Sequence, residues 1–215
     1  MEAIRDLADE RHRMVTGQLR PRGIRDPRLL AAFESVPRHL FLPEAERPWA
    51  YEDGAQPIGH EQTISQPYIV ALMTQVLSLT GSERVLEVGT GSGYQAAILS
   101  GLALEIHTLE LIPELAARAS HTLAELGLTN VQVHTGDGSL GWPAAMPYDA
   151  ILVAAAAPRA PQPLLDQLAD GGRMVIPVGA YGYQYLELWR RHGRIFDHEA
   201  LLSVAFVPLR GKHGW

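Results

Sequence analysis

The sequence contains no cysteine, and this absence removes several kinds of chemistry at once. Disulfides, thiolate metal sites and cysteine nucleophiles are all excluded. The nine histidines are scattered, and no two of them have the spacing of a metal-binding pair. We therefore expect neither a metal site nor covalent catalysis through sulfur.

Clusters of basic residues and long hydrophobic runs are also missing. The net charge is -6, and a nucleic-acid-binding face needs clustered cations to neutralise phosphates, so we expect no nucleic acid partner. No apolar run approaches the length of a membrane span, and the first residues are charged, without the apolar core of a signal peptide. We expect a cytoplasmic protein that does not bind membranes.

A glycine-rich turn lies between a short apolar run and a helical run. Residues 84–95 read RVLEVGTGSGYQ, with Gly89, Gly91 and Gly93 at alternate positions. Glycine permits the backbone angles of a sharp reversal, and it lets a ligand approach the bare backbone at a helix N-terminus. The pattern predicts the first βα unit of a nucleotide-binding α/β sheet.

Two residues indicate which ligand this turn binds. A dinucleotide turn needs a further glycine at the position that Tyr94 occupies. Glu87 stands shortly before Gly89, where a carboxylate repels a pyrophosphate but suits a cation. The pattern E-x-G-x-G-x-G is that of methyltransferases that use S-adenosylmethionine (SAM), and Glu87 and the three glycines are then cofactor ligands. The alternative is a glycine turn that binds nothing.

Acidic residues end the next two predicted strands. Glu110 follows Gly89 by about 20 residues, the distance at which a carboxylate holds a ribose in such folds; alternatively it is a surface charge at the start of the next helix. Asp137 and Gly138 follow the strand after that. Because the carboxyl ends of parallel strands share one edge of the sheet, these residues should converge on one crevice.

The remaining segments repeat the βα pattern. Hydrophobic periodicity predicts helices at 3–20, 27–35, 67–77, 94–100, 113–126 and 163–168, and strands at 84–88, 105–110, 130–134, 148–153, 173–179, 185–191 and 198–207. The last two strands should form an antiparallel pair. We predict an α/β, Rossmann-like fold with a mostly parallel sheet and N-terminal helices. One domain is expected, with residues 1–65 as helices and a lid and 66–215 as the SAM-binding core.

Ser65 stands before the helix that Pro67 opens, after an irregular segment at 37–63. One interpretation makes its hydroxyl the N-cap of that helix. The other makes the hydroxyl and the free amides of the helix N-terminus an anion site. The two are compatible.

The absent motifs restrict the reaction. Cytosine-C5 methylation needs a cysteine, amino-group methylation usually relies on an N/D-P-P-Y/F motif, and catechol-type methylation needs a carboxylate cluster; residues 154–158 are instead AAAAP. A carboxylate acceptor is ionised at neutral pH and needs no general base, so it remains compatible with the sequence.

Several motifs together resemble the protein-L-isoaspartate O-methyltransferase family. They are PIG at 57–59, QTISQPYIVA at 62–71, VLEVGTGSGYQAAIL from residue 85, GDG at 136–138, YDAI at 148–151, GGRMVIPVG from residue 171 and FVPL at 206–209. The resemblance covers residues 14 to 209.

The resemblance implies methyl transfer from SAM to the α-carboxylate of L-isoaspartyl residues in proteins and peptides, with S-adenosyl-L-homocysteine (SAH) as the second product and repair proceeding through a succinimide. It makes Ser65 the active-site serine, with Thr63 and Ile64 beside it lining the site and contacting the cofactor. The cofactor ligands it implies are Gly89, Gly91, Gly93, Glu110 with Leu111, and Asp137 with Gly138. We expect a monomer.

The chain departs from the family pattern at Glu61, Ala154 and Arg159, and in the tail RGKHGW after Leu209. Two alternatives to repair remain at this point. One is a peptide aspartyl-carboxyl methyltransferase of a biosynthetic pathway, and the other is a SAM-binding module without catalysis.

Overall fold

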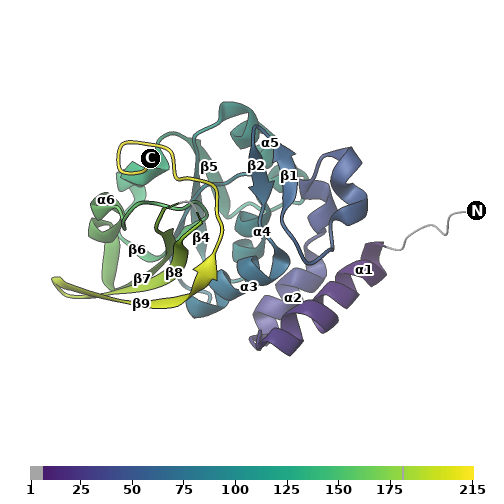
Figure 1. Cartoon of the computed structure of the whole chain (residues 1–215), viewed down its shortest axis with the longest axis horizontal. Coiled ribbons are helices and arrows are strands. Elements are labelled where there is room, and N and C mark those ends of the chain that lie inside the picture. Colours follow the sequence, from purple (N-terminus) through teal and green to yellow (C-terminus); the bar gives the residue numbers. More distant parts are fainter. Residues whose placement is uncertain (1–6, 181) are drawn as a thin grey trace, which may run out of the picture.

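A seven-stranded sheet forms the centre of the computed structural model, which describes residues 7–180 and 182–215 (Figure 1). The strand order is β5-β4-β3-β6-β7-β8-β9. Neighbours from β5 to β7 are parallel, and β8 and β9 are added antiparallel. The seven strands are β3 Arg84–Val88, β4 Glu105–Glu110, β5 Val131–Thr135, β6 Tyr148–Val153, β7 Leu168–Val178, β8 Gln184–His192 and β9 Ile195–Val204.

The helices pack against this sheet and against one another. Alternate residues of the central strands enter two hydrophobic cores: Val85 and Leu152 belong to the core that contains the N-terminal helices, whereas Leu86 and Ile151 belong to the core that contains α6. Strands buried on both faces read as continuous apolar runs, as these do. The helices are α1 Leu7–Met14, α2 Pro27–Ser35, α3 Pro67–Val76, α4 Tyr94–Ser100, α5 Pro113–Glu125 and α6 Gln162–Asp166.

The predicted fold class is confirmed, and β3 and α4 have the predicted bounds. The first predicted helix differs, because α1 ends at Met14 and Val15–Leu19 continue as a π-helix. Its start at residue 3 lies outside the described residues. The strand predicted from residue 198 to 207 ends earlier, because the side chain of Gln184 bonds both backbone groups of Phe206.

The segment 37–63 is more ordered than its sequence predicted. It contains short 3-10 turns and a hairpin of β1 Gln56–Gly59 and β2 Gln62–Ile64. These strands are too short for alternation to be visible in the sequence, and Pro57 lies within the first.

The predicted N-cap at Ser65 is wrong. Gln66 occupies the cap position, and no side chain caps the helix. The reason is Pro67: the residue before a proline is driven out of the helical region, so Gln66 is extended, with ψ 136°, and the helix starts at the proline. Ser65 lies one residue too far from the helix to act as its cap.

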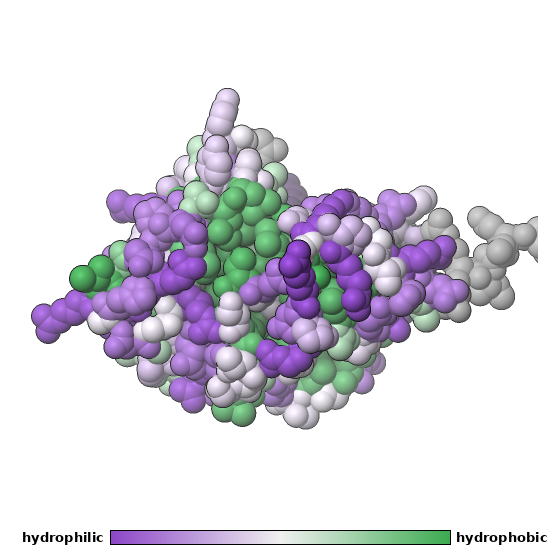
Figure 2. Space-filling model, turned by 90° about the horizontal axis from the view of Figure 1, so that it is seen from below, coloured by the Kyte–Doolittle hydropathy of each residue, from purple (hydrophilic) through white to green (hydrophobic). Residues whose placement is uncertain are grey.

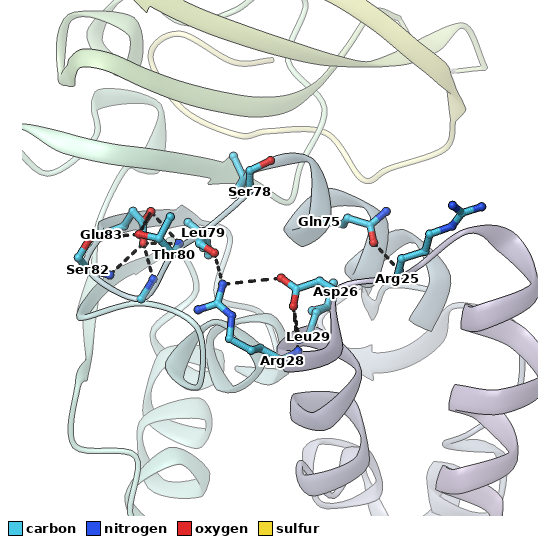
Figure 3. A network of polar contacts seen from close by, with 12 residues as sticks. Arg25, Asp26, Arg28, Leu29, Gln75, Ser78, Leu79, Thr80, Ser82 and Glu83 are labelled. Carbon is cyan, nitrogen blue, oxygen red and sulfur yellow. Dashed lines mark hydrogen bonds and ion pairs between the residues drawn. The ribbon is translucent and has the colours of Figure 1, made fainter.

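A polar network joins α2 to the start of β3 (Figure 3). Asp26 accepts a hydrogen bond from the backbone N of Arg28 at 2.8 Å and so caps α2, and the Arg28 guanidinium donates to the carbonyl of Leu79. Glu83 is 5% exposed and accepts hydrogen bonds from the amides of Thr80 and Gly81, each at 2.9 Å. Burial alone would raise the pKa of Glu83, but these hydrogen bonds outweigh it and lower the pKa to about 2.

The surface visible in Figure 2 is mostly hydrophilic around a hydrophobic area in its middle. Among the described residues, no helix is both long enough and apolar enough to cross a membrane.

The hydrogen bonds to Glu83 predict that the stability of the protein decreases at acidic pH. The pKa in the folded state lies below its ordinary value of 4.5, so the stabilisation is present above that pH and is lost as the pH falls toward about 2. Glu83→Gln should remove on the order of 3 kcal/mol of this pH-dependent stability. Urea unfolding of wild type and variant across this range measures it, with the exposed Glu125→Gln as control. Parallel pH curves for Glu83→Gln and wild type would contradict the assignment.

Candidate active site

A cavity opens at the carboxyl ends of β3, β4 and β6. Its wall is formed by the glycine turn with the ends of the three strands, by Gly138 after β5, by Val70 and Met73 of α3, by the β1–β2 hairpin with Ser65, and by the segment 207–210. The predicted convergence of strand ends is confirmed for Glu110 and Gly138, which both line this cavity.

The glycine turn has the backbone that its sequence predicts. Gly89, Gly91 and Gly93 all have positive φ, at 93°, 53° and 89°. A Cβ on Gly93 would lie 3.2 Å from the Cβ of Ala119, so this glycine also lets α5 approach the turn. The amides of Gly89 and Thr90 donate to the carbonyl of Leu109 at 2.8 and 3.1 Å, which fixes the turn against β4.

Glu110 lies in the wall of the cavity and is 7% exposed. One carboxyl oxygen accepts from the amide of Gly91 at 2.7 Å, and the other accepts from the amide of Ile112 at 2.9 Å. These two amides fix the carboxylate beside the glycine turn, and Leu111 lines the cavity next to it. A carboxylate held in this way has lone pairs left for hydroxyl donors.

Glu87 is also part of the sheet end, but it is not among the residues that line the cavity. Its side chain is fully buried, and neither carboxyl oxygen has a hydrogen-bond partner among the described residues. The hydroxyl of Thr108 on the neighbouring strand instead shares a 2.6 Å hydrogen bond with that of Thr90. Burial raises the pKa of Glu87 to about 8; the nearby hydroxyl of Thr108 opposes this rise, and the charge of Glu110 adds to it.

Asp137 and Gly138 occupy different positions relative to the cavity. Gly138 is in the wall, and a Cβ there would overlap the side chain of Val88. Asp137 is not in the wall: its carboxylate accepts from the amide of Ser139 at 2.9 Å and from the amide of Lys212 at 2.8 Å.

Ser65, Thr63 and Ile64 line the same cavity as the glycine turn. The backbone carbonyl of Ser65 accepts a 2.9 Å hydrogen bond from Arg38, which is fully buried. Sequence analysis missed Arg38. The sequence carried one signal for it: Arg38 stands between apolar residues in VPRHLF, and an arginine among apolar neighbours is a candidate for burial.

The tip of the hairpin carries one of the departures from the family pattern. His60 and Glu61 have left-handed backbones, with φ 52° and 59°, so the position that is usually glycine is strained here. Glu61 forms an exposed ion pair with Arg210 at 3.8 Å. Of the other departures, Ala154 lines the cavity and Arg159 is exposed.

The sheet order, the glycine turn and the carboxylate beside it define the class, which is that of the Rossmann-like SAM-dependent methyltransferases. A solved protein-L-isoaspartate O-methyltransferase superposes with a TM-score of 0.86 at 28% identity, covering 95% of this chain and 67% of that one. A Plasmodium falciparum structure solved with SAH gives a TM-score of 0.79 at 24% identity, covering 93% and 98%, and supports the fold.

The chain belongs to the protein-L-isoaspartate(D-aspartate) O-methyltransferase family, whose model matches residues 10–214. It is 54% identical over 208 residues to the protein-L-isoaspartate O-methyltransferase of Methanoregula boonei, covering 97% of this chain and 96% of that protein. It is 55% identical over 212 residues to protein-L-isoaspartate O-methyltransferase 2 of Marinobacter nauticus, covering 98% and 97%.

The buried Glu87 carboxyl predicts a second pH dependence, of the opposite sign. Its pKa in the folded state lies above its ordinary value of 4.5, so the folded protein holds a proton that the unfolded chain releases, and stability falls as the pH rises from 4.5 toward about 8. Glu87→Gln has no proton to lose. The unfolding free energy of the variant relative to wild type should therefore rise by on the order of 5 kcal/mol across this range.

Urea unfolding of the cofactor-free protein measures this difference, and Glu125→Gln on the exposed face of α5 serves as control. A constant difference between Glu87→Gln and wild type at all pH values would show that Glu87 is ionised in the folded protein.

Proposed function

We propose that this protein transfers the methyl group of SAM to the α-carboxylate of L-isoaspartyl residues in damaged proteins and peptides, which initiates their repair through a succinimide. The observation that carries the proposal is the shared cavity, which both the glycine turn with Glu110 and Ser65 line. The family match favours this reaction over methylation of ordinary aspartates and over a module without catalysis.

The residues of the cavity fit the cofactor. The Glu110 carboxylate, fixed by two amides, can accept hydrogen bonds from both ribose hydroxyls. Val88, Leu109 and Ile112 supply apolar wall, and Gly138 leaves room where a side chain would not fit. We assign the cofactor to Gly89, Gly91, Gly93, Glu110, Leu111 and Gly138, which line the cavity. Asp137 stands directly before Gly138 and outside the wall, and Glu87 is a buried acid in the strand before the turn.

When bound, SAM supplies a methyl group on a sulfonium. A carboxylate oxygen of the substrate forms the new bond to the methyl carbon, the carbon–sulfur bond breaks, and the sulfonium becomes a neutral thioether. No proton has to move, so the site needs no general base. Ser65 then acts by holding the carboxylate in line, with Thr63 and Ile64 beside it, and the rate gain comes from proximity.

We also propose that the protein acts as a monomer in the cytoplasm. Nucleic acid is not its substrate, because a net charge of -6 opposes binding to phosphates.

The direct test of the function uses labelled SAM and two peptides that differ only at one residue, isoaspartyl in one and aspartyl in the other. We expect label in the isoaspartyl peptide, in a base-labile methyl ester. Equal labelling of both peptides would indicate the biosynthetic alternative, and SAM binding without labelling of either would indicate the non-catalytic one.

Glu110→Ala should raise the Kd for SAH by about tenfold or more, because a hydrogen bond from a hydroxyl to a carboxylate contributes roughly 1.5–3 kcal/mol. Calorimetric titration with SAH and with its 2′,3′-dideoxy analogue separates a ribose contact from a change in the turn. Wild type should prefer SAH, and Glu110→Ala should lose that preference. An unchanged preference would show that Glu110 has only a structural role, as the acceptor for the amides of Gly91 and Ile112.

Ser65→Ala should leave stability nearly unchanged, because Ser65 does not cap α3. Turnover of the isoaspartyl peptide should fall by about a hundredfold, since misplacing the attacking oxygen by an ångström costs about that much. The thermal midpoint and the methylation rate are measured on one preparation, with Ser203→Ala on the exposed edge of β9 as control. Near-normal turnover would show that the Ser65 hydroxyl does not position the substrate carboxylate.

A further inference from the structure

The chain after Leu209 folds back onto the sheet end instead of leaving it. We call residues 210–215 the return segment. The amide of Leu209 and the indole N–H of Trp215 both donate to the carbonyl of Ala156, at 2.8 and 3.0 Å, and the amide of Trp215 donates to the carbonyl of Leu209 at 2.8 Å. Both ends of the return segment are thus held at Ala156, which follows β6.

The middle of the return segment is bonded to the loop after β5. The amide of Lys212 donates to the Asp137 carboxylate at 2.8 Å, and the amide of His213 donates to the hydroxyl of Ser139 at 3.0 Å. The Ser139 hydroxyl in turn donates to Asp137 at 2.6 Å. Ser139 is fully buried, so no water replaces a lost partner of its hydroxyl.

Gly211 makes this contact possible. A Cβ at this position would overlap the Asp137 carboxylate, and φ is 143°. No other residue type therefore brings the Lys212 amide to Asp137 without moving one of the two chains. Burial alone would raise the pKa of Asp137, but the hydrogen bond from Lys212 and those from Ser139 lower it, which keeps the carboxylate ionised as an acceptor.

One residue, Gly138, connects the contact between Lys212 and Asp137 to the cavity. Gly138 follows Asp137 directly, lies in the cavity wall and packs so closely on Val88 that a Cβ would overlap it. A shift of Asp137 therefore moves the wall. The Asp137 carboxylate, in contrast, is directed to the return segment and is not in the wall.

We propose that Gly211 and the return segment are a positioning element of the cofactor site, which acts through Asp137 to hold Gly138 against Val88. The proposal rests on the proposed function, because it assumes that this cavity binds SAM and SAH. The bonds come from backbone amides, so the identity of the Lys212 side chain is immaterial and the absence of a side chain at residue 211 is essential.

The test measures the Kd for SAH by calorimetry and the KM for an isoaspartyl peptide at saturating SAM. Gly211→Ala should raise the Kd by about tenfold, as expected when a supporting contact is lost, and leave the peptide KM within about twofold. Lys212→Ala should bind SAH as wild type does. Gly193→Ala is the matched control, because Gly193 also has positive φ, 61°, but a Cβ there would meet open space.

Ser139→Ala serves as a second variant in case Gly211→Ala does not fold; it removes the hydroxyl that links His213 to Asp137 and should raise the Kd severalfold. A Kd for Gly211→Ala equal to that of Gly193→Ala overturns the proposal, and so does a parallel rise in Kd and peptide KM, which would indicate general loosening.

Failure of wild type to bind SAH would instead overturn the proposed function. Amide hydrogen exchange then tests the inference separately: faster exchange at Ser139 and Leu140 in Gly211→Ala supports the coupling, and unchanged exchange overturns it.

Discussion

A single buried guanidinium holds the N-terminal third of the chain to the cofactor turn. Arg38 is fully buried and donates to the carbonyls of Ala50, at 2.7 Å, and Ser65, at 2.9 Å, while it lies 4.8 Å from the ring centre of Tyr94. Burial lowers the pKa of Arg38 to about 10, so the cation persists at neutral pH. Carbonyl dipoles and an aromatic face compensate this charge. Ser65 and the first residue of α4 therefore depend on the same charge.

The site is assembled by segments that are distant in the sequence and that no local pattern connects. The rigid part is the parallel sheet, whose strand ends fix the glycine turn through the carbonyl of Leu109. Two other parts of the wall come from segments on either side of the sheet in the sequence: the β1–β2 hairpin precedes β3, and the segment 207–210 follows β9. The proposed reaction requires few functional side chains, because a carboxylate acceptor has to be positioned but does not have to be deprotonated.

The parts that the sequence predicted are those with a strong local signal. Apolar runs bounded by glycines predicted β3 and α4 with their correct bounds. For β3 the signal is strong because a strand that is buried on both faces consists mainly of apolar residues. Arg38, the short hairpin and the contact of Asp137 with Lys212 were not predictable in this way. Each depends on a partner that is distant in the sequence, and neither periodicity nor propensity carries that information. The misplaced cap at Ser65 shows the same limit at short range, where the restriction imposed by Pro67 outweighed the preference of serine for caps.

The strengths of the contacts decide which part of the hairpin yields to a peptide. The ion pair between Glu61 and Arg210 is exposed, with 88% and 63% of the side chains accessible, so it contributes at most about 1 kcal/mol. Two residues before His60, Arg118 of α5 donates to the carbonyl of Ile58 at 2.6 Å, a partly buried charged hydrogen bond of roughly 1.5–3 kcal/mol. β1 is therefore held more strongly than the side chain of Glu61 at the tip. The tip also contains the strained backbones of His60 and Glu61, whereas Ser65 is anchored by Arg38, so the tip is the part of the hairpin that is displaced most easily.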